Sequence, residues 1–116
     1  MGDISIEFIE LVGTRSDDLL KRIFSKLDKS IVAKALRTVD PKTSEKIFVN
    51  LSENESEEIK VKNNILGAVR IEEVEAAQRQ IINIINKENI VWNKFYLNKI
   101  FLNNKYIFGR NILINN

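Results

Sequence analysis

The sequence predicts an all-α fold, a compact armadillo-like or orthogonal bundle of five to six helices with a C-terminal extension. The chain of 116 residues contains one proline and four glycines, and so few helix breakers favour long helices over a many-turned sheet. Apolar residues recur three or four positions apart along most of the chain. Short connections separate the resulting segments, which favours a compact bundle or an armadillo-like stack.

Three helices are expected between residues 16 and 51. The first begins after Ser16 and the second after Asp28, because both residue types cap helix starts. The third begins after Asp40, since Pro41 suits the first helical position, where a missing N–H costs nothing. The side chains expected to face the core are Leu19, Leu20, Ile23, Phe24, Leu27, Ile31, Val32, Ala35, Leu36, Val39, Ile47, Phe48 and Leu51.

A strongly charged helix is expected from residue 52 onward. Ser52 and Glu55 match a capping box, and Gly67 supplies the left-handed conformation that ends helices. The apolar content is thin, with Ile59, Val61, Ile65 and Leu66. Acidic residues come first and basic residues later, in the order Glu53, Glu55, Glu57, Glu58, Lys60, Lys62 and, after the glycine, Arg70. Two interpretations stay open: a solvated helix whose acids suit the positive end of the helix dipole, or a charged surface that meets a partner.

The clearest helical pattern spans residues 71–87. Acidic side chains occupy its first turn, where they suit the helix dipole. The apolar positions, three or four apart, are Val74, Ala77, Ile81 and Ile84 or Ile85. This helix completes a predicted domain of residues 1–90.

Residues 91–116 are expected to be an Asn-rich, basic extension of that domain. Residues 89–116 carry a charge of +4 and no acid, whereas the other 88 residues carry −2. Apolar triplets recur in this tail every five or six residues, a spacing that fits neither a helix nor a strand. One hypothesis is a fortuitous continuation of the reading frame beyond the domain. The alternative is a C-terminal helix or hairpin that covers the core.

The composition excludes several kinds of chemistry. With no His and no Cys, no catalytic residue, no metal site and no cofactor are expected, and the protein is not expected to be an enzyme. The best-formed helices carry acids, which disfavours a helix-turn-helix nucleic-acid binder, because phosphate contacts need clustered Lys and Arg. The start lacks a basic leader, and no apolar run approaches the ~18 residues of a membrane span, so a cytoplasmic protein is expected.

Four short segments occur in a recognisable order. They are Ala35-Leu36-Arg37, the run from Lys46 to Ser52, Gly67-Ala68-Val69-Arg70, and Val74-Glu75-Ala76-Ala77-Gln78. With these segments, about residues 8–90 of the chain resemble the C-terminal domain of the bacterial flagellar motor switch protein FliG. No single segment is decisive, but four in order with matching intervals make the resemblance fairly specific.

The resemblance implies a helical bundle at the rim of a cytoplasmic rotor ring. In that family one charged helix meets opposite charges on the stator, transmits torque and takes part in switching. Exposed charge pairs suit this task, because each is weak and quickly exchanged. The implied partners are flagellar stator and rotor-ring proteins, with self-association in a ring. No small-molecule substrate is implied, the membrane is reached only through the motor, and the implied location is the cytoplasmic face of the basal body.

Two of five functional charge positions of the family are kept. Arg37 and Arg70 match basic positions of the family. A further basic position falls on Asn54, and a pair of acids falls on Val61 and Lys62, so one acid is neutralised and the other reversed. The charge order along this helix is therefore inverted relative to the family.

The resulting candidate partner surface comprises Arg37, Glu53, Glu57, Glu58, Lys60, Lys62 and Arg70. Three interpretations remain: a divergent motor-switch component whose stator contact is rewired, one whose stator contact is lost, or a non-motor helical adaptor that kept the fold. For Arg37 and Arg70, the alternative to partner binding is a surface ion pair with Glu73.

Overall fold

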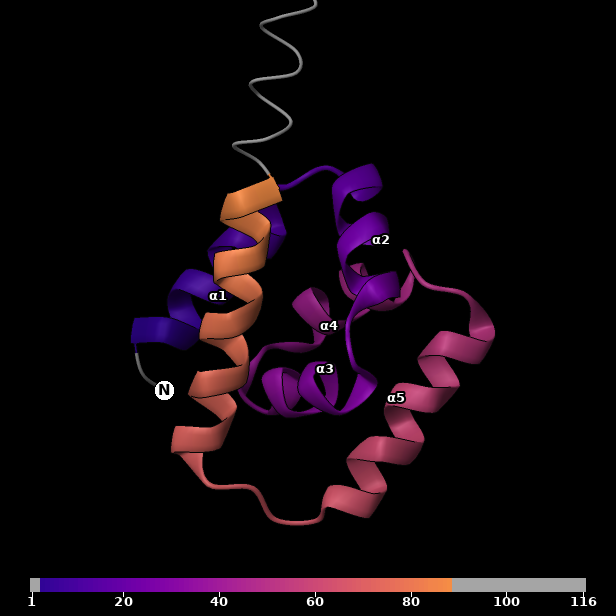
Figure 1. The fold of residues 1–116 in the computed structure, drawn as a ribbon, viewed down its shortest axis with the longest axis vertical. Helices are drawn as coiled ribbons and strands as arrows, with labels where there is room; N and C mark the ends of the chain where they lie inside the picture. The colour runs from indigo at the N-terminus through magenta and orange to yellow at the C-terminus, as the bar shows by residue number, and fades with distance from the viewer. Residues whose placement is uncertain (1–2, 89–116) are drawn as a thin grey trace, which may run out of the picture. The chain divides into compact units, whose positions relative to one another are not determined.

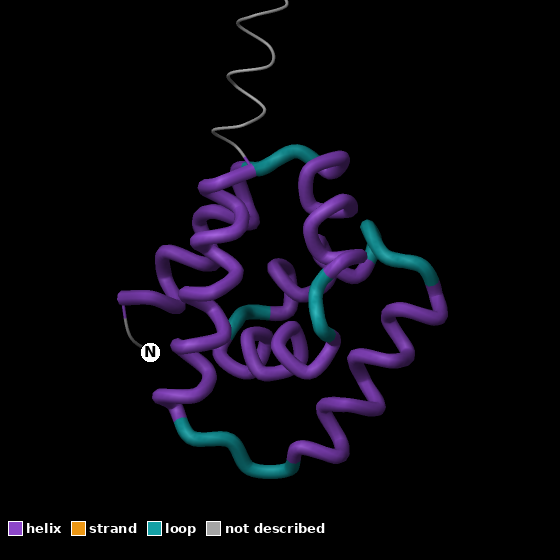
Figure 2. Tube along the Cα trace, viewed as in Figure 1, coloured by secondary structure: helices purple, strands orange, loops and turns teal. Residues whose placement is uncertain are grey.

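The computed structural model describes residues 3–88, and all regular structure in this range is helical (Figures 1 and 2). The elements are α1 (Asp3–Thr14), α2 (Asp17–Lys26), α3 (Lys29–Ala35), the 3-10 helix η1 (Leu36–Thr38), α4 (Pro41–Phe48), α5 (Glu53–Leu66) and a helix over residues 71–88. The predicted all-α fold is thus confirmed. The chain divides into two units, Met1–Ile84 and Ile85–Asn116, and the packing described below lies within the first. The predicted extension, residues 91–116, lies outside the described residues.

Helix α1 was not among the helices predicted from the sequence. Its inward face consists of Ser5, Phe8 and Val12, which are three and four residues apart and all buried. A serine on the inward face and a glycine near the end weaken the sequence pattern. With α1 included, residues 3–88 form six α-helices, in agreement with the five to six helices predicted from the sequence.

The predicted helix starts are confirmed at three caps. The Ser16 hydroxyl accepts the Leu19 N–H at 3.3 Å, and the Asp28 carboxylate accepts the Ser30 N–H at 2.7 Å. Ser52 and Glu55 make both bonds of the capping box, at 2.9 and 3.1 Å. These bonds are local in sequence, which is why residue type alone predicts them.

The helix expected after Asp40 begins at Pro41 as predicted, but three details of the expected helices differ in the structure. The helix expected through Val39 ends at Ala35 and tightens into η1, so Leu36 and Val39 are only half-buried. The Asp40 carboxylate accepts the Thr43 hydroxyl instead of a backbone N–H. Gly67 has the expected positive φ of 63°, but its ψ of −136° lies outside the left-handed helical region, in a conformation favourable only for glycine.

The core forms where the short helices α3 and α4 meet the longer ones. Helix α3 packs against α5, and α4 contacts both α1 and α2. Most predicted core side chains are buried, although Leu27, Ile31, Phe48 and Leu51 are only half-buried, like Leu36 and Val39. Helix α5 contributes one fully buried side chain, Ile59, and polar contacts join its Glu55 to Lys29 of α3 and its Asn63 to Arg37 of η1. None of the described helices is both long enough and apolar enough to span a bilayer.

A closed ring of hydrogen bonds, built around the fully buried Ser5 and Gln78, joins α1, η1 and the helix over residues 71–88. The Ser5 hydroxyl donates to Gln78 Oε1 at 2.8 Å, and Gln78 Nε2 donates to the Thr38 hydroxyl at 2.8 Å. Since each hydroxyl has one proton, the 2.7 Å bond between Thr38 and Ser5 has Thr38 as its donor. Gln78 Nε2 also donates to the Ala35 carbonyl at 2.8 Å. The ring therefore fixes both ends of η1, the element that carries Arg37.

Candidate functional site

The structure brings Arg37 of η1 against α5. The Arg37 guanidinium donates through Nε to the Asn63 side-chain oxygen, and through Nη2 to the Asn63 carbonyl at 3.0 Å. The candidate residues Glu53, Glu57, Glu58, Lys60 and Lys62 all lie on α5, so six of the seven belong to one pair of neighbouring elements. For Arg37, the alternative of a surface ion pair with Glu73 is not found among the described residues, because the guanidinium bonds to Asn63 instead.

Arg70 does form the alternative ion pair. Its Nε lies 3.5 Å from a Glu73 carboxylate oxygen, and Lys34 Nζ lies 3.8 Å from the other. The Arg70 side chain is nevertheless 81% exposed. A pair so open to water is worth little and exchanges readily, so it leaves Arg70 accessible to a partner.

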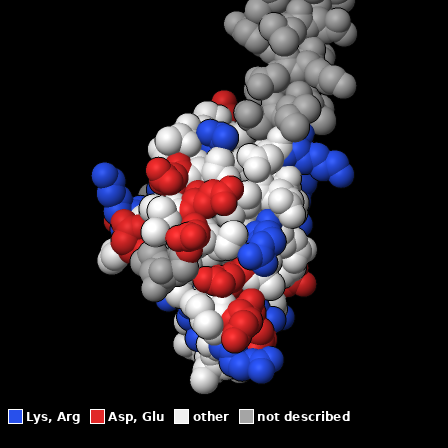
Figure 3. Space-filling view, turned by 90° about the vertical axis from the view of Figure 1, so that its left-hand side faces the viewer, with Lys and Arg blue, Asp and Glu red and all other residues white. Residues whose placement is uncertain are grey.

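The acids of α5 are exposed, but acids alone do not single out this helix. Glu53, Glu57 and Glu58 are all classed as exposed. Figure 3 shows acidic side chains also gathering on the side of the molecule where α1 lies, away from α5. Helix α2 also runs from acids, Asp17 and Asp18, to a base, Lys26, so the charge order does not single out α5 either. What α5 adds is contact with Arg37 of η1.

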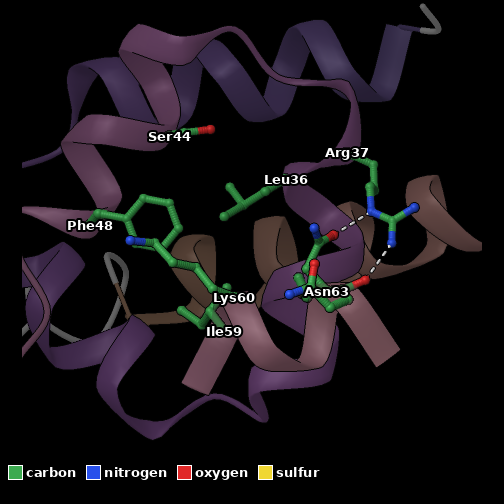
Figure 4. Close-up of a pocket in the computed structure, with 9 residues that line it drawn as sticks. Leu36, Arg37, Ser44, Phe48, Ile59, Lys60 and Asn63 are labelled. Carbon is green, nitrogen blue, oxygen red and sulfur yellow. Dashed lines mark hydrogen bonds between the residues drawn. The ribbon is translucent and has the colours of Figure 1, made fainter. Parts of the chain in front are cut away.

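The basic half of α5 borders a groove. A cavity of about 520 Å³ opens between α3, η1, α4 and α5 (Figure 4). Its walls include Leu36, Phe48 and Ile59, and Lys60 Nζ lies 5.8 Å from the centroid of the Phe48 ring, within reach of a cation–π interaction. The sequence analysis missed Phe48 and Asn63 as site residues. The spacing Lys60–Asn63 indicates that both share one face of α5, but nothing in the sequence places them beside η1 or α4.

Glu55 has a structural task at the start of α5. The Ser52 N–H donates to its carboxylate, and Lys29 Nζ lies 3.9 Å away on the other side. The Ser52 N–H is the main cause of a Glu55 pKa below its ordinary value; partial burial opposes this shift, and the Lys29 charge adds to it. Glu55 thus serves the cap of α5.

Replacing Glu55 with glutamine should make the free energy of unfolding less dependent on pH in the acidic range. A carboxylate whose folded-state pKa is lowered contributes stability above its unfolded pKa of about 4.3 and loses it as pH falls through the folded value. Urea unfolding between pH 6 and pH 3 should show a shallower fall in stability for Glu55→Gln than for the unaltered chain. The matched control is Glu53→Gln, which removes an exposed acid from the same first turn of α5. Equal slopes for Glu55→Gln and the unaltered chain would contradict the assigned role.

Other residues of the four recognised segments hold the fold together. Lys46 Nζ donates to the Gly13 and Arg15 carbonyls at 3.0 and 3.2 Å, which caps the end of α1. Asn50 Nδ2 donates to the Asp17 carboxylate at 3.1 Å and so ties α4 to the start of α2. These two side chains are structural, whereas Glu53, Glu57, Glu58 and Lys60 of α5 are exposed.

Comparison with known proteins gives the same result as the motifs. The family model described as "FliG C-terminal domain" matches residues 5–89. The flagellar motor switch protein FliG of Borreliella burgdorferi is 36% identical over 81 residues, which are 70% of this chain and 23% of that protein. The FliG proteins of Thermotoga maritima and Vibrio cholerae are 34% and 28% identical, over 61% and 73% of this chain and 21% and 24% of theirs. The chain thus matches less than a quarter of the length of each of these relatives.

Proposed function

We propose that this chain, which belongs to the FliG C-terminal domain family, is a flagellar motor-switch component that contacts other motor proteins through η1, α5 and residues 67–70. The family match over residues 5–89 is the observation that carries this proposal. Its contacting residues are Arg37, Glu53, Glu57, Glu58, Lys60, Lys62 and Arg70. The expected partners are stator and rotor-ring proteins at the cytoplasmic face of the basal body, with self-association of the chain in a ring.

The charges on α5 indicate in which order basic and acidic groups would lie on the partner. Exposed acids at the start of α5 favour basic groups on the partner, and Lys60 and Lys62 favour acidic groups one or two turns further along. Such contacts give orientation and a fast association rate more than affinity, as a repeatedly engaging rotor surface requires. The inverted order relative to the family then corresponds to a partner whose charges are rearranged in the same way.

A non-motor adaptor is the second candidate, because Val61 takes the place of a family acid and is 47% exposed. An exposed aliphatic side chain at this position favours a less polar partner. Fluorescent fusion in the host separates the two functions: foci at flagellar bases support the motor component, whereas diffuse signal contradicts it.

The charged surface can be tested by the double substitution Glu57→Lys/Glu58→Lys. Binding to the cytoplasmic segment of the host's stator protein should weaken about tenfold at low salt, because two favourable exposed contacts become repulsive. The effect should shrink as salt rises to about 0.5 M, where screening shortens the reach of each charge. Titration calorimetry at two salt concentrations measures both effects.

The matched control is Glu7→Lys/Glu10→Lys, which makes the same charge change on exposed positions of α1. This control variant has the same net charge as Glu57→Lys/Glu58→Lys. It should bind the stator segment as tightly as the unaltered chain does. If both pairs weaken binding equally, the interaction depends on net charge and not on α5. If neither does, the acids of α5 are merely solvated.

A further inference from the structure

The groove beside η1 has an apolar floor that the fold leaves uncovered. Ile59 is buried beneath it, and Leu36 and Phe48 are only half-buried, although the sequence pattern places both toward the core. Both side chains line the groove, and Figure 4 shows the Lys60 chain extending toward the Phe48 ring. A large apolar side chain of another molecule would cover this exposed apolar surface, and such cover is favourable.

The charge of the groove is of one sign. Two cations, Arg37 and Lys60, and no acid are among the residues that line it. The two bonds from Arg37 to Asn63 fix the guanidinium at the rim and use two of its five N–H donors. The remaining donors and the Lys60 ammonium are suited to a carboxylate. A basic partner segment would be repelled here, although it would be attracted to Glu57 and Glu58 on the same helix.

We propose that this groove binds a short segment of another protein in which an Asp or Glu side chain lies beside a large apolar side chain. The carboxylate meets Arg37 and Lys60, and the apolar side chain covers Leu36 and Phe48. This inference rests on the proposed partner surface and adds to it an apolar anchor, which charge pairing alone does not supply. An inorganic anion would gain nothing from the apolar floor, so it fits the groove less well than a peptide does.

The test is a selection of random 12-residue peptides displayed on phage against the full chain. Selected peptides should share an acidic residue within four positions of Leu, Ile, Phe or Met. Their binding should weaken at least tenfold for Lys60→Glu and less than threefold for Lys62→Glu. The second variant makes the same charge change on α5 at a residue outside the groove lining. Amide signals of residues 36, 59 and 63 should shift when the peptide is added.

Each other outcome overturns the inference. These outcomes are no enriched peptides, a consensus without an acid, or equal weakening by the two lysine variants. Displacement of the peptide by millimolar inorganic phosphate would indicate a simple anion site. A dimer in sedimentation velocity that Lys60→Glu dissociates would make a second copy of this chain the occupant instead.

The stator segment separates this inference from the proposed function. If the segment binds the chain and Glu57→Lys/Glu58→Lys weakens that binding, while the peptide selection yields no acidic apolar consensus or the two lysine variants weaken peptide binding equally, the groove inference fails and the proposed function stands. If the segment does not bind at all while acidic apolar peptides still occupy the groove, the proposed function fails and the groove has a different partner.

Discussion

Replacing Gln78 with leucine should lower the free energy of unfolding by about 3 kcal/mol, because it removes one member of the hydrogen-bonded ring and leaves the others unpaired. Gln78 is fully buried, and its amide serves the Ser5 hydroxyl, the Thr38 hydroxyl and the Ala35 carbonyl. Leucine is of similar size but can bond to none of them. Each buried polar group left without a partner costs roughly 1–3 kcal/mol.

Urea unfolding followed by circular dichroism measures this loss as a lower midpoint. Gln80→Leu is the matched control, since Gln80 is exposed two residues further along the same helix and should change stability by less than about 0.5 kcal/mol. Ser5→Ala combined with Gln78→Leu should cost less than the sum of the two single changes, because both belong to one network. Equal effects of Gln78→Leu and Gln80→Leu would show that the ring does not stabilise the fold.

The same substitution should disturb the candidate site from a distance. The ring holds Ala35 and Thr38, the residues on either side of the Leu36–Arg37 pair. If η1 loosens, Arg37 loses its fixed position against Asn63, and Leu36 loses its position in the groove. Binding of an acidic apolar peptide should therefore weaken in Gln78→Leu under conditions where the variant is still folded.

Replacing Lys29 with methionine should cost about 2–3 kcal/mol of stability, because three backbone carbonyls lose their donor. Lys29 is only 8% exposed, and its ammonium donates to the carbonyls of Phe24, Ser25 and Leu27, each at 3.1 Å. These carbonyls lie at the end of α2, where the helix dipole favours a positive charge. Methionine keeps the apolar stem of the side chain and removes only the charge and its hydrogen bonds.

Lys26→Met is the control for this change, since Lys26 is exposed on the last turn of α2. It should alter stability by less than about 0.5 kcal/mol in the same urea experiment. In Lys29→Met the free energy of unfolding should also fall less steeply as the pH is lowered, because Glu55 loses the cation 3.9 Å from its carboxylate. A Lys29→Met protein as stable as Lys26→Met would mean that water replaces the ammonium at no cost.

The sequence by itself determined where the helices begin. Ser16, Asp28 and Ser52 cap helices in the structure as their residue types predict, and the spacing of apolar residues identified most of the buried face of α2. Caps and helical faces are interactions between residues no more than about four positions apart, so they can be read from a single chain. The resemblance to a family, also present in the sequence, was confirmed by the match over residues 5–89.

The tertiary structure alone decided which polar residues are buried and where Arg37 lies. The bonds of Ser5 and Thr38 to Gln78 join residues 73 and 40 positions apart, and Arg37 meets Asn63 across 26 positions. No local pattern encodes such pairings, because they depend on how whole helices pack. The early end of α3 has the same origin: a change to 3-10 geometry at Leu36 lets the ring close and leaves Leu36 facing the groove instead of the core.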